Sequence, residues 1–351
     1  MESYLNVQLA TYRDKPQPTV FINQASIQVW REYASVAERL GAYVVLAQHL
    51  LQLQFPVEMG IQQTPAYQAA IRRGIRPKSN HALQLNAPQA VHLSLHEGVG
   101  GTVPLIHVPQ RADFLKVAAA LAFRNEPQTF SAAIGAFLVN GYSNWDRIER
   151  KQVEWVRTRN SAEWGHLFQQ LLADRASYQD SFMIITKQPY SGVDSHVAGM
   201  SPQRWLARSH TIRVAHESAH LFTKRAYGQL NHHLLDELVA DYCGLVTAFG
   251  TYDASLALRL LGIDTTQRPT GRVSHYLPPM LREDEIYRQL ATIVTRAAHT
   301  LQAFTCWVCP DPTSISAMRL LLHTISQASL QSLACTNALA ALQACYQRSR
   351  K

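Results

Sequence analysis

The sequence predicts an α+β protein, in which a mixed α/β N-terminal half with a small sheet precedes a mainly helical C-terminal half. Short apolar runs of strand-like character occur before residue 190. From Pro202 onward, apolar residues recur almost throughout at helical spacing. The intervening segment, PYSGVDSHVAGMSP, is rich in Gly, Ser and Pro. We therefore expect two regions, 1–195 and 196–351, with one composite domain as the alternative.

The N-terminal half is expected to mix helices and strands. Apolar residues such as Ile27, Trp30 and Leu40 fall near a period of 3.6, which is typical of an amphipathic helix. The segment AVHLSLHEG alternates apolar and polar residues, and VPLIHV is a short apolar run, so we expect two strands joined by a glycine-rich turn. The expected elements are a long helix over 24–54, a proline-containing region over 56–88, strands over 90–98, 103–108, 130–141 and 181–188, and helices over 111–123 and 160–176.

The C-terminal half is expected to be a series of helices. Their expected ranges are 203–226, 234–249, 253–261, 281–304 and 314–346, and the last is expected to break near Ser329. Residues four apart in such helices leave the same face, about one turn from each other.

Composition excludes several classes of protein. Hydrophobic residues make up 47% of the 351, enough for a sizeable core, and the 17% of charged residues is too low for a disordered chain. The net charge of +8 comes from scattered basic residues whose densest cluster is the short RRGIRPK, so we expect no nucleic-acid binding. No apolar stretch is long enough to span a bilayer, and the first residues lack a basic segment followed by an apolar core. We therefore expect a cytoplasmic protein without a membrane segment.

The five cysteines do not form a recognisable framework. Their odd number argues against a complete set of disulfides. Cys306 and Cys309 form a single CxxC, and a zinc ribbon needs a second pair at similar spacing, which Cys335 and Cys345 do not provide. We expect buried or incidental thiols, and the sequence assigns no role to Cys306 and Cys309.

The motif HESAH carries the strongest chemical signal. His216 and His220 are four apart in the helix expected over 203–226, so both imidazoles leave one face and can bind one Zn²⁺ at about 2.0–2.1 Å. Glu217 points to a different side, and its expected place is beside the metal-bound water, as general base. The alternative is the polar face of a solvated helix.

A second motif, in LLDELVADYCG, supplies the missing ligand. Glu237 and Asp241 are again four apart on an expected helix, so they share one face. Glu237 is the candidate third ligand. Asp241 is expected to accept a hydrogen bond from the non-ligating nitrogen of a ligand histidine, as such histidines nearly always require.

HESAH followed by ELVAD resembles the gluzincin metallopeptidases, of which the thermolysin-like enzymes are an example. These carry HExxH on one helix and ExxxD on the next. The resemblance implies a zinc peptidase with the same ligands, base and supporting aspartate that the spacing predicts. The intervening segment, 221–236, is slightly shorter than in those enzymes, which bears on the turn between the helices. The segments NGYSNWDRI and LLDELVADY together also resemble an uncharacterised bacterial family.

The resemblance also implies where substrate would lie. Gluzincins bind substrate along an edge strand upstream of the zinc helix, and AIGAFLVNG is the best candidate for that strand. Its residues Ala136, Phe137 and Asn140 are the expected substrate contacts, through strand addition by an extended peptide. An ordinary buried strand is the alternative.

The related enzymes stabilise the oxyanion with a downstream Tyr or His. The segment GRVSHYLPP offers Arg272, His275 and Tyr276, of which we favour Tyr276 and then His275. The alternative is a surface loop with a packed aromatic residue.

We therefore expect a zinc-dependent hydrolase of amide or peptide bonds, most simply an intracellular peptidase of narrow specificity. Two histidines and a carboxylate also suit Fe²⁺, so a non-haem iron enzyme acting on a small molecule or peptide is an alternative. A metal-bound protein without turnover is a third reading, and the intact Glu217 argues against it.

Overall fold

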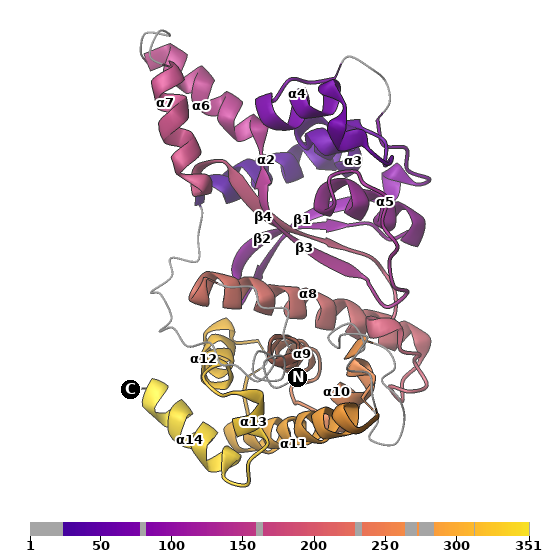
Figure 1. Ribbon diagram of the computed structural model, residues 1–351, viewed down its shortest axis with the longest axis vertical. Coiled ribbons are helices and arrows are strands. Elements are labelled where there is room, and N and C mark those ends of the chain that lie inside the picture. The colour runs from indigo at the N-terminus through magenta and orange to yellow at the C-terminus, as the bar shows by residue number, and fades with distance from the viewer. Residues whose placement is uncertain are drawn as a thin grey trace.

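The computed structural model describes residues 24–77, 82–158, 164–228, 234–263, 272–273, 284–311 and 313–350. A four-stranded mixed sheet lies in the N-terminal half, and the C-terminal half is mainly helical (Figure 1). The α+β class predicted from the sequence is therefore confirmed.

The sheet has the strand order β1-β2-β4-β3. Its strands are β1 (His92–Gly98), β2 (Gly101–His107), β3 (Ala136–Ser143) and β4 (Gln179–Ile185). β1 and β2 form an antiparallel hairpin, β2 runs parallel to β4, and β3 runs antiparallel to β4. β3 is thus an edge strand of the described sheet, as the candidate substrate strand needs to be.

One face of the sheet is covered by helices of the N-terminal half, namely α2 (Gln24–Leu40), α3 (Ala42–His49) and α5 (Arg111–Ala122) (Figure 1). Their apolar side chains join those of the strands in one buried cluster, in which Trp30 and Phe182 are fully buried. Removal of this apolar surface from water is the main source of the stability of this layer.

A single long helix, α8 (Pro202–Tyr227), lies across the other face of the sheet (Figure 1). Its Val214 and Leu221 pack against strand residues that include Leu105 and Met183. Ser201 caps the helix by accepting from the Arg204 amide, and the proline at the first helical position already has the φ that a helix requires.

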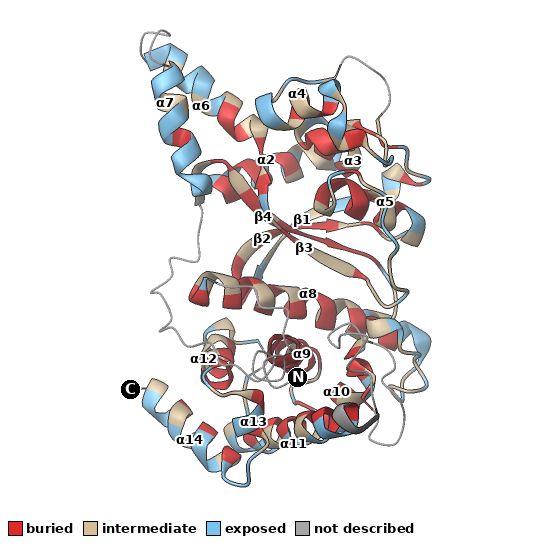
Figure 2. Cartoon of the chain, viewed as in Figure 1, coloured by how far each residue is buried: buried red, intermediate tan, exposed pale blue. Residues whose placement is uncertain are grey.

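Beneath α8 lies α9 (Leu234–Phe249), which is buried along almost its whole length (Figure 2). The helices around it form the largest apolar cluster of the described chain. They are α10 (Ala254–Leu261), α11 (Asp284–Val308), α12 (Ile315–Ser326), α13 (Leu330–Leu333) and α14 (Ala338–Ser349). These ranges confirm the helices predicted for the C-terminal half within the described residues, including the break near Ser329, except that the last helix is interrupted a second time over 334–337.

The boundary predicted at 195/196 stays a prediction. α8 packs against the sheet with one face and against α9 with another, so it belongs to both layers. None of the described helices is long and apolar enough to cross a membrane.

Several predicted elements were wrong in detail. The helix predicted over 24–54 is interrupted at Gly41, whose φ of 86° a residue with a side chain rarely adopts, and the chain continues as α3 and a 3₁₀ turn over Leu51–Gln54. The strand predicted over 130–141 begins only at Ala136.

Within the described residues, two α-helices were missed. α4 (Pro65–Arg73) lies in the proline-containing region, where Thr64 and Pro65 serve as cap and first helical residue. α6 (Trp145–Thr158) follows β3, and with α7 (Trp164–Ala173) it projects from the body of the molecule (Figure 1).

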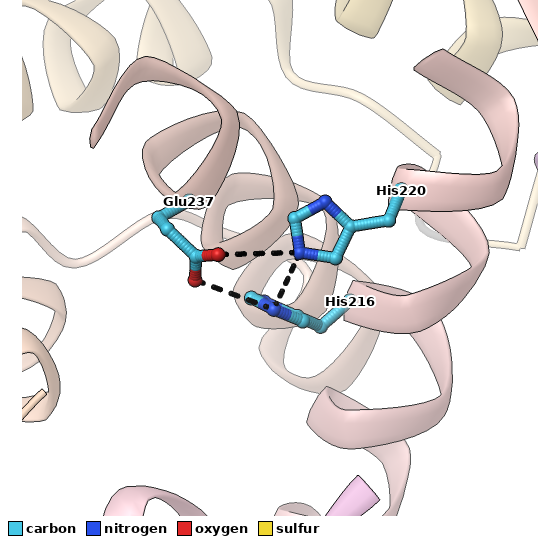
Figure 3. Close-up of side chains that lie close together, drawn as sticks. All are labelled: His216, His220 and Glu237. Atoms are coloured by element: carbon cyan, nitrogen blue, oxygen red, sulfur yellow. Dashed lines mark hydrogen bonds and ion pairs between the residues drawn. The ribbon is translucent and has the colours of Figure 1, made fainter. Parts of the chain in front are cut away.

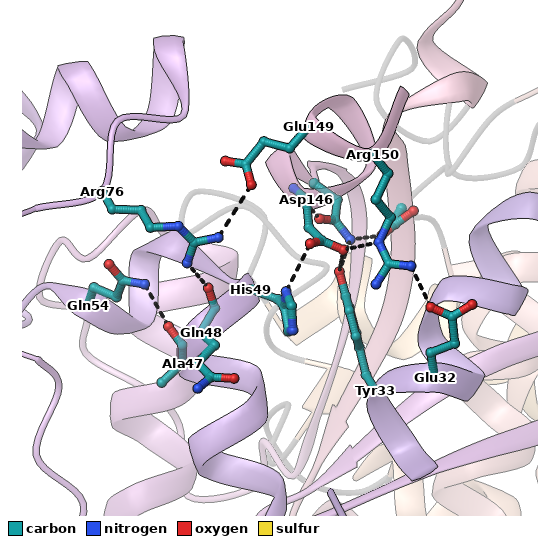
Figure 4. Close-up of polar contacts among 12 residues, drawn as sticks. Glu32, Tyr33, Ala47, Gln48, His49, Gln54, Arg76, Asp146, Glu149 and Arg150 are labelled. Carbon is teal, nitrogen blue, oxygen red and sulfur yellow. Dashed lines mark hydrogen bonds and ion pairs between the residues drawn. The ribbon is translucent and has the colours of Figure 1, made fainter. Parts of the chain in front are cut away.

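A polar cluster around Asp146 joins α2, α3 and α6 (Figure 4). Its carboxylate accepts hydrogen bonds of 2.7 Å from the Tyr33 hydroxyl and from Arg150 Nε. His49 Nδ1 lies 3.2 Å from the other carboxylate oxygen. Burial would raise the pKa of Asp146, but these partners outweigh it and lower the pKa below its usual range.

Candidate metal centre

Two neighbouring helices bring together His216, His220 and Glu237, whose nearest ligand atoms all lie within 4.8 Å of one another (Figure 3). α8 carries both histidines on one face, and α9 carries the glutamate. The Nε2 atoms of the two histidines are 3.0 Å apart. Glu237 Oε2 lies 3.6 Å from His216 Nε2, and Glu237 Oε1 lies 3.5 Å from His220 Nε2.

These distances suit a shared cation. Two nitrogens at about 2.0–2.1 Å from one tetrahedral ion are roughly 3.3–3.4 Å apart, close to the spacing of the two histidines. The group is nearly enclosed, since the side chains of His216 and Glu237 are each 7% exposed and that of His220 is 13% exposed. No other group of three His, Cys, Asp or Glu in the described residues has this geometry.

The charges of the group are coupled. Burial would raise the pKa of Glu237, but contact with His220 and the charge of Arg272 outweigh it and keep the carboxylate ionised. Burial would lower the pKa of His220, but Glu237 outweighs it and raises the pKa. The negative charge of Glu237 thus stabilises a positive charge on the histidines, whether a proton or a metal ion carries it.

Asp241 lies behind His216, one helical turn after Glu237 on α9. Its Oδ1 is 2.9 Å from His216 Nδ1, the ring nitrogen that faces away from Glu237. Arg272 forms an ion pair with the other carboxylate oxygen, Oδ2. The side chain of Asp241 is fully buried, so these partners are what allow it to stay charged.

Tyr190, which the sequence analysis missed, completes this arrangement. Its hydroxyl donates to Asp241 Oδ1 at 2.7 Å and lies 2.9 Å from His216 Nδ1. Arg272 Nη1 donates to the same hydroxyl oxygen at 2.7 Å. Tyr190 lies in the Gly-, Ser- and Pro-rich segment before α8, where no periodicity or motif marks one residue above another.

A cleft of about 270 Å³ opens onto the three ligand residues. The residues that line it besides the ligands are 133–138, Tyr190, Ser191, Arg213, Glu217 and Arg272. Glu217 is half-buried, and its carboxylate has no hydrogen-bond partner among the described residues. It is the one acidic residue lining the cleft, among the described residues, that is not part of the His–His–Glu group.

One wall of the cleft is formed by the start of β3, and another by residues of α8. Gly135 O accepts from the amide of Thr186, the residue after β4, at 3.0 Å, so Gly135 directs its backbone groups toward β4. Because the direction alternates along an antiparallel strand, Ala136 and Leu138 direct their N–H and C=O groups toward the free edge.

Of the three residues expected to contact substrate, Ala136 and Phe137 line the cleft and Asn140 does not. The Phe137 ring packs against Phe114 and other aromatic rings on the far side of the sheet, so its part in the wall is mainly backbone. His275 and Tyr276 lie outside the described residues.

The profile of a protein family of unknown function, DUF7005, matches residues 1–337. The chain belongs to the DUF7005 family. Neither the comparison with curated proteins nor that with solved structures found a match. The family description names no activity. The chemical properties of this DUF7005 protein therefore have to be inferred from the geometry of its cleft. That geometry gives a group of two histidines and one glutamate able to hold a metal ion.

Proposed function

We propose that this DUF7005 protein is a metal-dependent hydrolase that uses zinc to cleave an amide or peptide bond. One observation carries the proposal. The His–His–Glu group opens into a cleft of about 270 Å³ that also holds the Glu217 carboxylate and the free edge of β3. A candidate metal site, proton acceptor and substrate wall therefore share one cavity.

The donor set fits zinc. Two imidazole nitrogens and one carboxylate oxygen are the protein ligands of many catalytic zinc sites, which leave a fourth position for water or substrate. When bound, zinc would polarise a substrate carbonyl and increase the acidity of water. Asp241, at 2.9 Å from His216 Nδ1, supports the use of Nε2 by that histidine.

Glu217 is the proposed general base. It lines the cleft beside the histidines of its own helix and has no hydrogen-bond partner among the described residues. In the proposed reaction its carboxylate accepts the proton of the attacking water and then transfers that proton to the leaving nitrogen. Tyr276, and after it His275, stay the proposed groups beside the developing oxyanion.

The proposed substrate is an extended peptide or a related amide. The backbone groups of Ala136 and Leu138 that face the free edge can form hydrogen bonds to such a chain, as in other cases of strand addition. The likeness to gluzincins, the narrow specificity and the cytoplasmic location remain parts of this proposal.

Iron gives the second candidate function. Two histidines and one carboxylate are also the ligands of non-haem Fe²⁺ oxygenases, which keep open positions for oxygen and substrate. In that case the protein acts on a small molecule or peptide by oxidation. The base-like placement of Glu217 favours hydrolysis over this alternative and over a metal-bound protein without turnover.

The first experiment is elemental analysis of the purified protein by mass spectrometry, alongside His216→Ala and His210→Ala. His210 is a matched control because it lies on the same helix, is half-buried and is not part of the group. We expect one equivalent of zinc in the wild type and in His210→Ala, and none in His216→Ala. One equivalent of iron would move the proposal to oxygen chemistry, and no metal after reconstitution would refute both.

The second experiment separates turnover from binding. Wild type and Glu217→Gln are compared on a peptide library, with metal content measured in the same samples. We expect Glu217→Gln to keep its metal and to lose about 10²–10⁴-fold in cleavage rate, the range of general-base catalysis. Full activity in this variant would exclude Glu217 as the base.

A further inference from the structure

The turn Tyr190–Gly192, between β4 and α8, is strained. Ser191 has φ 55° and ψ 15°, a left-handed conformation that residues other than glycine rarely adopt. Its hydroxyl is buried with no hydrogen-bond partner among the described residues, although the residue lines the metal cleft. Such strain persists only where the surrounding structure imposes it, and it concentrates at functional sites.

The surroundings that impose it belong to α8, the helix of the two histidines. The Tyr190 amide donates to Ser209 Oγ at 2.9 Å. Arg213 donates to the carbonyl oxygens of Gln188 and Pro189 at 3.2 Å, and its guanidinium lies 5.8 Å from the centre of the Tyr190 ring. α8 therefore carries the ligand histidines and also fixes the turn that brings the tyrosine to them.

The Tyr190 hydroxyl contacts Arg272, Asp241 and His216 in one buried hydrogen-bond network. Arg272 donates to its oxygen, and the hydroxyl donates to Asp241 Oδ1, at 2.7 Å each. The single proton of the phenol is therefore directed at Asp241, while the phenol oxygen accepts from Arg272. His216 Nδ1 lies 2.9 Å from the same Asp241 oxygen and 2.9 Å from the Tyr190 hydroxyl.

We propose that Tyr190 is a positioning residue of the metal site, whose phenol fixes the tautomer and the orientation of His216. With the Tyr190 proton committed to Asp241 and its oxygen occupied by Arg272, neither partner of His216 Nδ1 can donate to it. Nδ1 must therefore carry the ring proton, and Nε2 must present its lone pair toward His220 and Glu237. Tyr190 would thus act on a bound metal through His216, whose Nδ1 lies 2.9 Å from the phenol oxygen.

This inference rests on the proposed metal site but not on the proposed hydrolysis. A tyrosine that only fills the core would contribute through its ring, which packs against His216 at 5.9 Å between ring centres. Tyr190→Phe keeps that ring and removes the hydroxyl alone. If the tyrosine only fills the core, Tyr190→Phe should leave metal binding unchanged. If its hydroxyl positions His216, the same variant should weaken metal binding.

The test measures the Zn²⁺ dissociation constant by competition with a chromogenic chelator, and the visible absorption of the Co²⁺-loaded protein. Tyr190→Phe is compared with wild type and with Tyr242→Phe. Tyr242 is the matched control, because it is a fully buried tyrosine on α9 whose hydroxyl accepts a hydrogen bond from Thr305 at 3.0 Å, away from the cleft. Both variants lose one buried hydroxyl.

We expect Tyr190→Phe to bind Zn²⁺ about 10–100-fold more weakly, the usual effect of removing a group that orients a metal ligand. Its Co²⁺ spectrum should shift, while Tyr242→Phe should match wild type in both measurements. Equal affinity and an unchanged spectrum in Tyr190→Phe would overturn the inference and leave the proposed hydrolase intact. A wild type without measurable affinity would overturn both.

A second variant covers the case in which Tyr190→Phe does not fold. Ser209→Ala removes the fully buried hydroxyl that accepts from the Tyr190 amide and holds the turn, without changing a charge or a residue that lines the cleft. The inference requires weaker Zn²⁺ binding in this variant also, and affinity equal to wild type would contradict it.

Discussion

His216 and His220 direct their Nε2 atoms at each other across 3.0 Å, with the carboxylate of Glu237 facing both. Two imidazole nitrogens at this distance need a proton or a metal ion between them, since two bare lone pairs would repel each other. A proton on His220 Nε2 can serve, in the neutral ring or in the cation that the raised pKa of His220 favours. A metal ion bound by all three residues is the other possibility, and the two differ in what a chelator does.

The first prediction concerns metal-linked stability. A ligand that binds only the folded chain stabilises it by about 2.7 kcal/mol at a free concentration 100 times its dissociation constant. Zinc should therefore raise the melting temperature of the wild type, and a strong chelator should reverse the effect. Thermal unfolding of His216→Ala should show neither response. Equal responses in the two proteins would place the metal elsewhere.

The second prediction concerns the crossing of α8 and α9. A Cβ added to Gly244 would lie 2.8 Å from the backbone oxygen of Ile212, closer than such atoms approach in proteins. Gly244→Ala should therefore push the two helices apart and cost about 1–3 kcal/mol of unfolding free energy. Because Glu237 lies on α9 and both histidines lie on α8, metal affinity should fall as well.

Denaturant unfolding and metal titration of the same samples test this. Gly165→Ala is the control, because a Cβ at Gly165 meets nothing within 4 Å. A Gly244→Ala protein with unchanged metal affinity would show that the crossing distance does not govern the site.

The third prediction concerns the free edge of β3. Ala136→Pro removes one backbone N–H that faces the edge, at the first position of an edge strand, where proline is tolerated. If peptides bind by strand addition, kcat/KM should fall about tenfold, the effect of about 1.4 kcal/mol from one lost hydrogen bond. Metal content should not change. Ala136→Ser keeps the N–H and should retain activity, and a loss equal to that of the proline variant would instead point to the side chain.

The fourth prediction concerns pH and Asp146, which is not part of the candidate metal centre. Its pKa is lowered in the folded chain, so its contribution is present above the unfolded pKa of about 3.9 and is lost as the pH falls through the lower folded value. Asp146→Asn should cost about 1–2 kcal/mol near pH 7, a modest figure because solvent screens part of the cluster. Urea unfolding should show a constant gap between the two proteins at pH values above about 3.9, and a gap that narrows as the pH is lowered further below it. A gap independent of pH would assign the loss to packing.

The sequence predicted the His–His–Glu group because the relevant residues are close together in the chain on two helices. A spacing of four residues on one helix settles which side chains share a face, and this held for His216 with His220 and for Glu237 with Asp241. The pairing of the two helices could be inferred from the chemistry that their residues share.

Unlike Asp241, the supporting tyrosine Tyr190 could not be predicted in the same way. Tyr190 reaches His216 only because a strained turn is held by side chains of a helix that begins later in the chain. Similarly, the break at Gly41 depends on one backbone angle, and a hydrophobic period alone does not reveal it. Such contacts depend on tertiary structure, and no pattern of spacing encodes them.

The open edge of β3 has a consequence for how copies of this protein meet. Unpaired strand edges pair with one another readily, which leads to self-association. The register between β3 and β4 shifts between Asn140 and Tyr142, where the exposed Gly141 has φ 72°. This bulge ends the straight part of the edge soon after the cleft. If peptides bind by strand addition, the straight part of the edge therefore suits a short peptide and is too short to template a continuous sheet with a second copy.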